Sequence, residues 1–528
     1  MRNLLGSVPE KKKKIFYIII LFFFSILFNQ YYGYKGIFPI DSFFPFNSGY
    51  DVLNGFFPFK DYWTRTSPFI DLTQAVFFKI FGVSWFSYVL HASIFNFLFT
   101  ISTFYTLRKF KLDINYCFFY SLLVAILAYP SAGTPYGDHQ SSYLSIIAIF
   151  CFILALKTNL RIFWFFLPII FGIAFLTKQA PTGQIFLIVI FLSIIYFLFN
   201  FNLEKIIFGI IGSLFFISIF LIILKIGRIP LLSFLEQYIL FPLSVGEKRL
   251  EFIFPLEFKR VILRFKLLHL SLLTLLVVAI KNIKKDYKYL KHYEFFIIVA
   301  LISSAFALIV HQLMIVNGIF IFFIIPILAA FSHIYCLKYF KNKNYIIYFL
   351  IFLSISSTAH YGYKYIHKRD FMDLNKVNFE KAIDAKMLDK KLSGLKWITA
   401  IYPDDPKKEI LKLKESINII KNDNRKKIIA TDYQFISVIL SSYDYSPNKY
   451  WGEYHAYPDK GHKYFEIYKN FFIEKLKENK IEIVYIVKPL WGGHDLLKSV
   501  LDETCVEKKI ITDILESQLI LNCKDLKN

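Results

Sequence analysis

The feature that most constrains this chain is a succession of long apolar segments in its first two thirds. Phe, Ile and Leu dominate residues 1–361, whereas residues 362–528 have the mixed composition of a soluble protein. One membrane crossing needs about 20 apolar residues. The pattern therefore predicts a polytopic α-helical membrane protein with about eleven spanning helices, near 15–32, 84–107, 115–131, 141–157, 162–177, 184–200, 205–226, 266–281, 294–316, 318–338 and 344–361.

The lysines and arginines between these segments predict which loops face the cytoplasm. With the N-terminus placed inside, the inner loops hold 19 Lys and Arg in about 50 residues, and the outer loops hold about 11 in roughly twice that length. The net charge of +23 thus follows the positive-inside rule and does not indicate a nucleic-acid partner. The odd number of spans places residues 362–528 outside the cytoplasm, and we expect the chain in a plasma (inner) membrane.

Residues 362–528 alternate helix and strand patterns, which is typical of a small α/β layer structure. The predicted elements are a helix at 407–421, a strand at 426–432, a helix at 462–480 and a strand at 481–489. The chain is therefore expected to divide into a transmembrane domain, 1–361, and an extracytoplasmic α/β domain, 362–528.

Two predicted outer segments, 33–83 and 227–264, are long, rich in aromatic residues and contain proline. Within the first, residues 68–82 place apolar side chains on one helical face and polar ones on another, the latter being Asp71, Gln74 and Lys79. Such a pattern predicts a helix that lies flat in the membrane interface.

Enzyme signatures of fixed spacing are absent from the sequence, including a P-loop, GxGxxG, HExxH, CxxC and GxSxG. What remains are charged residues in the predicted outer loops. Asp41 follows the first span among aromatic residues, and Asp138 and His139 directly precede the fourth span. Two cations join them, Arg65 in WTRTSPF and Lys178 in FLTKQAPTG.

Two carboxylates and two cations on one side of a membrane suit a site that handles a lipid-linked phosphate. The cations would hold the phosphate, and a carboxylate would act as a base. Each residue also has a plainer interpretation. Asp41 could be a solvated loop carboxylate, Asp138 a helix N-cap, and Lys178 a snorkelling lysine.

The five cysteines fall into two groups. Cys117, Cys151 and Cys336 lie in predicted spans, where cysteine packs as a small apolar residue. Cys505 and Cys523 lie in the domain that we predict to be extracytoplasmic, an oxidising location, so we expect a disulfide between them. Two buried free thiols are the alternative.

The order of these motifs resembles the GT-C class of integral-membrane glycosyltransferases, and within it the family-39 branch of dolichyl-phosphate-mannose–protein mannosyltransferases and lipid A aminoarabinose transferases. The resemblance lies in Asp41, the run NGFFPFKDYWTRTSPFIDLTQAVFFKIFG, Asp138 in the second outer loop, and the turn FLTKQAPTG. It covers about residues 15–200, with the rest similar only in architecture. The chain departs from the family where Ser42 follows Asp41 and His139 follows Asp138, since the family often has a second acidic residue there.

The resemblance implies the transfer of a sugar from a polyprenyl-phosphate donor to a hydroxyl of a lipid, glycan or protein acceptor, with inversion at the sugar C1. Asp41 and Asp138 are then the predicted catalytic carboxylates, with Asp41 as the general base. Arg65 and Lys178 would hold the donor phosphate. Asp138 and His139 would shape the acceptor side or hold a divalent cation, and no other cofactor is implied.

Two other functions remain open on the sequence. A transporter or flippase of a lipid-linked saccharide would show repeats and charges near the bilayer midplane, whereas here the charges gather at the predicted outer face. A glycan polymerase or ligase would share the large outer loops.

Overall fold

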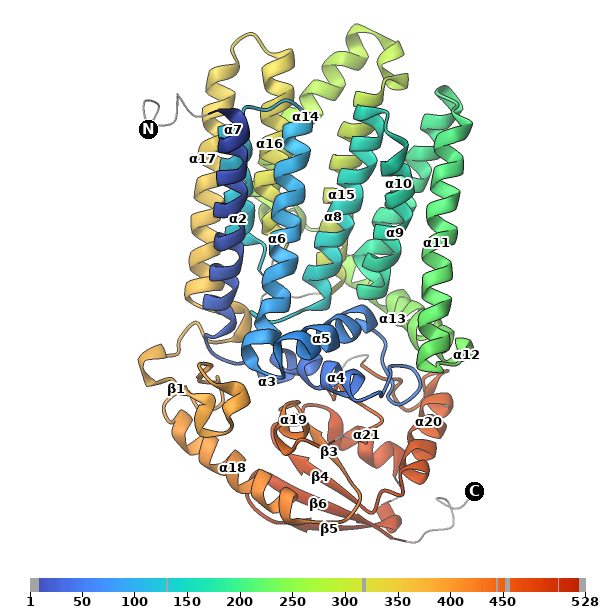
Figure 1. Cartoon of the computed structure of the whole chain (residues 1–528), viewed down its shortest axis with the longest axis vertical. Helices are drawn as coiled ribbons and strands as arrows, with labels where there is room; N and C mark the ends of the chain where they lie inside the picture. The colour runs from blue at the N-terminus through green and yellow to red at the C-terminus, as the bar shows by residue number, and fades with distance from the viewer. Residues whose placement is uncertain are drawn as a thin grey trace.

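The computed structural model describes residues 9–129, 132–315, 320–442, 445–451, 456–501 and 503–521. Eleven apolar helices in these ranges form one bundle (Figure 1). Nine are long enough to cross a membrane and two, α7 and α9, are shorter. Each coincides with one predicted span, so the predicted membrane fold is confirmed. The helices are α2 (Glu10–Gly33), α6 (Trp85–Lys109), α7 (Ile114–Leu127), α8 (Gly137–Thr158), α9 (Arg161–Thr177), α10 (Gln179–Phe199), α11 (Leu203–Gly227), α14 (Lys266–Lys285), α15 (Tyr293–Ile315), α16 (Ile324–Tyr339) and α17 (Lys343–Tyr361).

The helices differ in how much of their surface other helices cover. α8 and α16 are buried on nearly all sides, whereas α11 is exposed on nearly all sides although it is apolar throughout. Leu214 and Ile222 of α11 are 58% and 55% exposed. An apolar helix without an inward stripe needs an apolar solvent, so α11 lies at the lipid-facing margin of the bundle. It approaches α9 closely at Gly212, where a Cβ atom would collide with the backbone carbonyl of Phe165.

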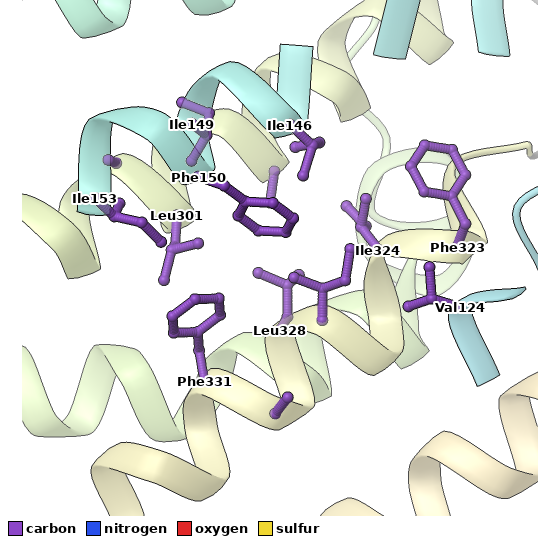
Figure 2. Packing of buried hydrophobic residues seen from close by; sticks show 14 of the residues in the cluster. Val124, Ile146, Ile149, Phe150, Ile153, Leu301, Phe323, Ile324, Leu328 and Phe331 are labelled. Carbon is purple, nitrogen blue, oxygen red and sulfur yellow. The ribbon is translucent and has the colours of Figure 1, made fainter. Parts of the chain in front are cut away.

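The core of the bundle follows helical spacing on its two most buried helices (Figure 2). α8 contributes one face at intervals of three and four residues, and α16 meets it with a face of the same spacing. Inside a bilayer such helices associate through close packing rather than through water exclusion. The residues that meet are Ile146, Ile149, Phe150 and Ile153 of α8, Leu301 of α15, and Ile324, Leu328 and Phe331 of α16.

Both long predicted outer segments lie at the end of the bundle that carries the C-terminal domain (Figure 1). We call it the domain end. The first segment forms α3 (Pro39–Ser42), α4 (Phe44–Leu53) and α5 (Pro68–Phe81), and the second forms α12 (Leu231–Phe234), a π-helical turn and α13 (Phe241–Leu250). The two predicted outer segments and the C-terminal domain therefore share one side, while the location of that side outside the cytoplasm stays a prediction.

Helix α5 lies across the domain end of the bundle (Figure 1), and its position in a membrane interface stays a prediction. The helix begins at Pro68 and ends before Gly82, whose φ is positive, so its bounds agree with the predicted 68–82. Most of its polar face is turned toward the protein. Asp71 is fully buried and accepts hydrogen bonds from Ser48 Oγ at 2.6 Å and Tyr62 OH at 2.9 Å. Ile80, on the other face, is 66% exposed. The sequence pattern identified an amphipathic helix and could not tell which face the protein covers.

The C-terminal domain contains a four-stranded sheet of order β3-β4-β6-β5. β3 (Lys427–Thr431) and β4 (Ile483–Val487) are parallel neighbours, while β6 (Leu515–Ile520) is antiparallel to β4 and to β5 (Val506–Ile510). The predicted helices are α18 (Pro406–Asn422) and α20 (Phe465–Glu478). The remaining elements are α19 (Ile436–Leu440), α21 (Gly493–Val500) and a two-stranded ladder, β1 (Ile383–Asp384) with β2 (Lys396–Trp397).

The C-terminal domain and the first long loop share one interior. Phe43 packs with Trp397 and Phe435 across the junction. Asp51 of α4 forms an ion pair with Lys449 at 2.9 Å, and both side chains are fully buried. A buried pair of this kind is favourable only in a fixed geometry, so it holds the C-terminal domain in register over the bundle.

Candidate functional site

A pocket lies at the domain end, between the loops of the bundle and the C-terminal domain. Its wall contains four of the five predicted substrate-binding and catalytic residues, which the sequence separates by up to 137 positions. The C-terminal domain adds side chains from a segment more than 250 residues further along the chain. The lining residues are Asp41, Phe44, Pro45, Trp63, Thr64, Arg65, Thr66, Ser67, Pro135, Tyr136, Gly137, Asp138, Lys178, Asn448, Tyr450 and Ala456.

Asp41 lies in the single helical turn α3, which begins at Pro39 and follows α2 by a short link. The side chain is half-buried, and Tyr136 OH lies 3.5 Å from its Oδ2 as the donor of a long hydrogen bond. Burial, together with the charge of Asp138, raises the pKa of Asp41 to about 7, against opposing effects of Lys178 and Tyr136. A carboxylate with a pKa near the working pH is suited to general-base chemistry.

Asp138 lies in the first turn of α8, and both of its oxygens are occupied. Lys178 Nζ lies 2.5 Å from Oδ2, and His311 Nε2 lies 2.9 Å from Oδ1. The carboxylate is 5% exposed. Asp138 is therefore placed to orient Lys178. Because both of its oxygens already have partners, it is less available as a base than Asp41.

Three cations surround the pocket. Arg65 and Lys178 line it, and the charge of Arg249, from the end of α13, reaches Arg65, Lys178 and Asp138. Burial and the charge of Arg249 lower the pKa of Arg65 to about 10, which leaves the guanidinium protonated at neutral pH. In the described ranges, no ion pair involves Arg65 or Arg249. The pocket thus carries excess positive charge and can bind an anion such as a phosphate.

One glutamine fixes the spacing between two of these cations. Gln179 Nε2, next to Lys178, donates to the carbonyl oxygens of Arg65 at 2.8 Å and of Tyr238 at 2.7 Å. Three segments of the fold are joined at this amide. Arg65 and Lys178 are consequently held on one wall by the scaffold rather than by flexible loops.

His139 does not line the pocket. The ring is buried among aromatic side chains, with centroid distances of 5.7 Å to Tyr136 and 4.6 Å to Phe320. The substrate-binding role proposed for it stays a prediction. The histidine that contacts Asp138 is His311, to which the sequence assigned no role. An ionisable residue inside an apolar span is itself a sign of function, and this signal could have identified it.

Two other residues, one in the pocket wall and one near it, were missed. Tyr450 comes from the C-terminal domain, and no local motif marks it. Arg249 comes from the charged run GEKRLE of the second long loop, and its cluster of charges is the only sequence signal for it.

Nothing in the described residues favours a metal site. No group of three or more His, Cys, Asp or Glu side chains in those ranges could hold a metal ion. The oxygens of Asp138 are directed to Lys178 and His311. The divalent cation considered for Asp138 and His139 therefore stays an untested expectation.

The predicted disulfide falls partly outside the described residues. Cys505 is buried and disulfide-bonded, while Cys523 lies outside the described ranges. Cys117, Cys151 and Cys336 are buried free thiols, as expected for residues of the bundle. The pairing of Cys505 with Cys523 stays a prediction.

An apolar groove opens on the side of the bundle next to the pocket. It lies between α9, α10 and α11 and encloses about 310 Å³. Thr182 of its wall is four residues after Lys178, across a break in the helix at Ala180. The groove residues are Pro168, Phe171, Gly172, Phe175, Thr182, Gly183, Phe186, Ser213, Phe216 and Ile217.

No protein-family model matches the chain, and no curated protein matches it. Among solved structures, the chain is similar to ArnT from Cupriavidus metallidurans bound to undecaprenyl phosphate. The TM-score is 0.44 at 10% identity, over 98% of this chain and 99% of that chain. Because this similarity in structure and sequence is low, any function proposed for this chain must rest on its own pocket.

Proposed function

We propose that this protein is a membrane glycosyltransferase that moves a sugar from a polyprenyl-phosphate donor to a hydroxyl acceptor at the domain end of the bundle. The observation that carries the proposal is the pocket itself, where a carboxyl group with a pKa of about 7 shares the wall with Arg65 and Lys178. The charge of Arg249 interacts with both cations. A sugar transfer in which a phosphate is the leaving group needs a base for the acceptor hydroxyl and a site that binds the phosphate. We further propose that this end faces the outside of a plasma (inner) membrane.

The chemistry is a single displacement. The acceptor hydroxyl attacks C1 of the sugar while Asp41 takes its proton, and the bond from C1 to the phosphate oxygen breaks. The polyprenyl phosphate leaves with the bonding pair, and attack from the opposite face inverts C1. Arg65, Lys178 and Arg249 stabilise the charge that grows on the phosphate, an effect worth about 3–4 kcal/mol for one well-placed donor.

The apolar groove supports a lipid-linked donor. Its wall is almost wholly hydrocarbon, and one of its residues, Thr182, follows Lys178 by four positions in the chain. A prenyl chain in this groove would bring its phosphate to the cations without leaving the membrane. A water-soluble nucleotide-sugar donor would have no use for such a groove.

The proposal is tested with purified protein, a set of undecaprenyl-phosphate sugars labelled in the sugar, and membranes that supply acceptors. We expect label to pass from at least one donor into a product that is not the donor, with release of undecaprenyl phosphate. Movement of intact donor across a vesicle membrane without such release would identify a carrier and refute the proposal.

A further inference from the structure

The carboxyl ends of β3 and β4 lie beside the pocket. The proposed transfer assigns no role to the loops that follow them. β3 ends at Thr431 and β4 at Val487, and the two strands are parallel neighbours. In sheets of this kind, ligands bind in the crevice beyond the carboxyl ends of adjacent strands. Asp432 follows β3 directly, and its charge interacts with that of Asp41.

Trp491, in the loop after β4, is unlike the other tryptophans of the chain. It is 43% exposed, whereas the remaining five are at most 3% exposed. Its ring centroid lies 5.8 Å from that of Phe38, three residues before Asp41. A large aromatic face that stays open beside a catalytic pocket is a candidate for binding a ligand.

The position of Trp491 is fixed by its neighbours. Its backbone N–H donates to Asp432 Oδ2 at 2.9 Å, and the backbone N–H of Asp432 donates to Pro489 O at 3.1 Å. These two bonds tie the loop after β4 to the loop after β3. Asp432 is itself only 2% exposed, so its part is to position Trp491 rather than to touch a ligand.

Tyr450 is a second aromatic residue of the C-terminal domain near Asp41. It is a half-buried pocket residue of the C-terminal domain, its ring meets Phe44 edge-on at 5.8 Å, and its phenol interacts electrostatically with Asp41, Arg65 and Asp432. Tyr450 and Trp491 thus both lie near Asp41, the first in the pocket wall and the second in contact with Phe38.

We propose that Trp491 and Tyr450 form an acceptor subsite for a saccharide, with the indole stacking on the apolar face of a pyranose ring and the phenol hydroxyl bonding to a sugar hydroxyl. The inference rests on the proposed function, because the bound ring must present a hydroxyl to Asp41. A peptide is a poorer fit because β3, the nearest sheet edge, is almost wholly buried and offers no strand to extend.

Binding of the full-length protein is measured on arrays of oligosaccharides, peptides and phospholipids, with Trp491→Leu and Trp491→Phe as variants. The parent is expected to bind at least one saccharide class. Trp491→Leu should weaken that binding at least 10-fold, and Trp491→Phe should retain part of it. Tyr345→Leu, which removes an 82% exposed aromatic residue from the start of α17, is the control and should bind as the parent does.

Three results would overturn the subsite: no saccharide bound by the parent, binding to peptides or phospholipids alone, or equal saccharide binding by Trp491→Leu. Thermal stabilisation by undecaprenyl phosphate is measured on the same proteins and should be unchanged in Trp491→Leu. Failure of that lipid to stabilise the parent would count against the proposed donor, whereas the array result would still decide the acceptor.

Discussion

The pKa of Asp41 is unusual for an aspartate because of where the residue lies. Half-buried beside Asp138, it has its pKa raised to about 7, and Lys178 and Tyr136 only partly oppose the shift. Asp138 has the same side chain, yet it is tied to a lysine and a histidine. Two identical carboxyl groups in one pocket thus have different surroundings, and in the proposed reaction Asp41 is the base while Asp138 holds Lys178.

The pH dependence of transfer should report the pKa of Asp41. A base works only when it is deprotonated, so a raised pKa means that activity is lost at low pH. We expect kcat/KM, which reports the groups of the free protein, to rise with pH through about 7 and then to level off. The measurement is a rate profile from pH 5 to 9 on the parent. A profile that is flat through this range would show that no group like Asp41 limits the reaction.

Replacing Lys178 by alanine should weaken the donor interaction more than it harms folding. A charge-assisted hydrogen bond contributes about 1.5–3 kcal/mol, so we expect the apparent affinity for undecaprenyl phosphate to fall about 10- to 100-fold. Lipid binding is measured by thermal shift. Lys79→Ala, which removes an exposed lysine of α5, is the matched control. Equal affinity of Lys178→Ala and the parent would leave Lys178 as a structural partner of Asp138 alone.

At the scale of elements, hydropathy identified all eleven helices because a bilayer demands long apolar segments. The same rule could not orient α5. Its polar face, which includes Asp71, is covered by Ser48 and Tyr62, and their position over α5 is known only from the folded structure. His311 and Tyr450 were missed for a similar reason. His311 contacts Asp138 from α15, and Tyr450 lines the pocket from the C-terminal domain. No residue close to either of them in the sequence indicates these contacts.

The junction between α4 and the C-terminal domain should depend on the ion pair of Asp51 with Lys449. Lys449→Met leaves a buried carboxylate without this cation, a change that typically costs about 3–5 kcal/mol. We expect the apparent melting temperature in detergent to fall by several degrees, and Asp51→Leu combined with Lys449→Met to recover much of the loss.

The exposed pair of Lys381 with Asp404 is the control for that comparison. Lys381→Met should change stability by about 1 kcal/mol or less, because solvent screens such pairs. If Lys449→Met melted with the parent, the ion pair would not be what holds the two parts together.

At the scale of the whole molecule, one side of the bundle carries everything that the proposed reaction needs. The two long loops, the pocket and the C-terminal domain lie together at the domain end (Figure 1). The positive-inside rule predicts that this side is extracytoplasmic, from 19 against about 11 Lys and Arg.

A fusion of alkaline phosphatase, an enzyme active only outside the cytoplasm, after Asn528 tests that orientation. We expect an active fusion, because eleven crossings from a cytoplasmic N-terminus end outside. A fusion after Lys285, the last residue of α14 at the opposite end of the bundle, should be inactive. An active fusion after Lys285 together with an inactive one after Asn528 would show the opposite membrane orientation, with the pocket on the cytoplasmic side.

The most direct test of the central claim is the transfer rate of Asp41→Asn. The amide keeps the shape of the side chain and removes the base, so we expect a loss of about 10²- to 10⁴-fold in rate. Stabilisation by undecaprenyl phosphate should remain close to that of the parent, since Arg65, Lys178 and Arg249 are untouched. Transfer by Asp41→Asn at the parental rate would contradict the assignment of Asp41 as the base and, with it, the account of how this pocket works.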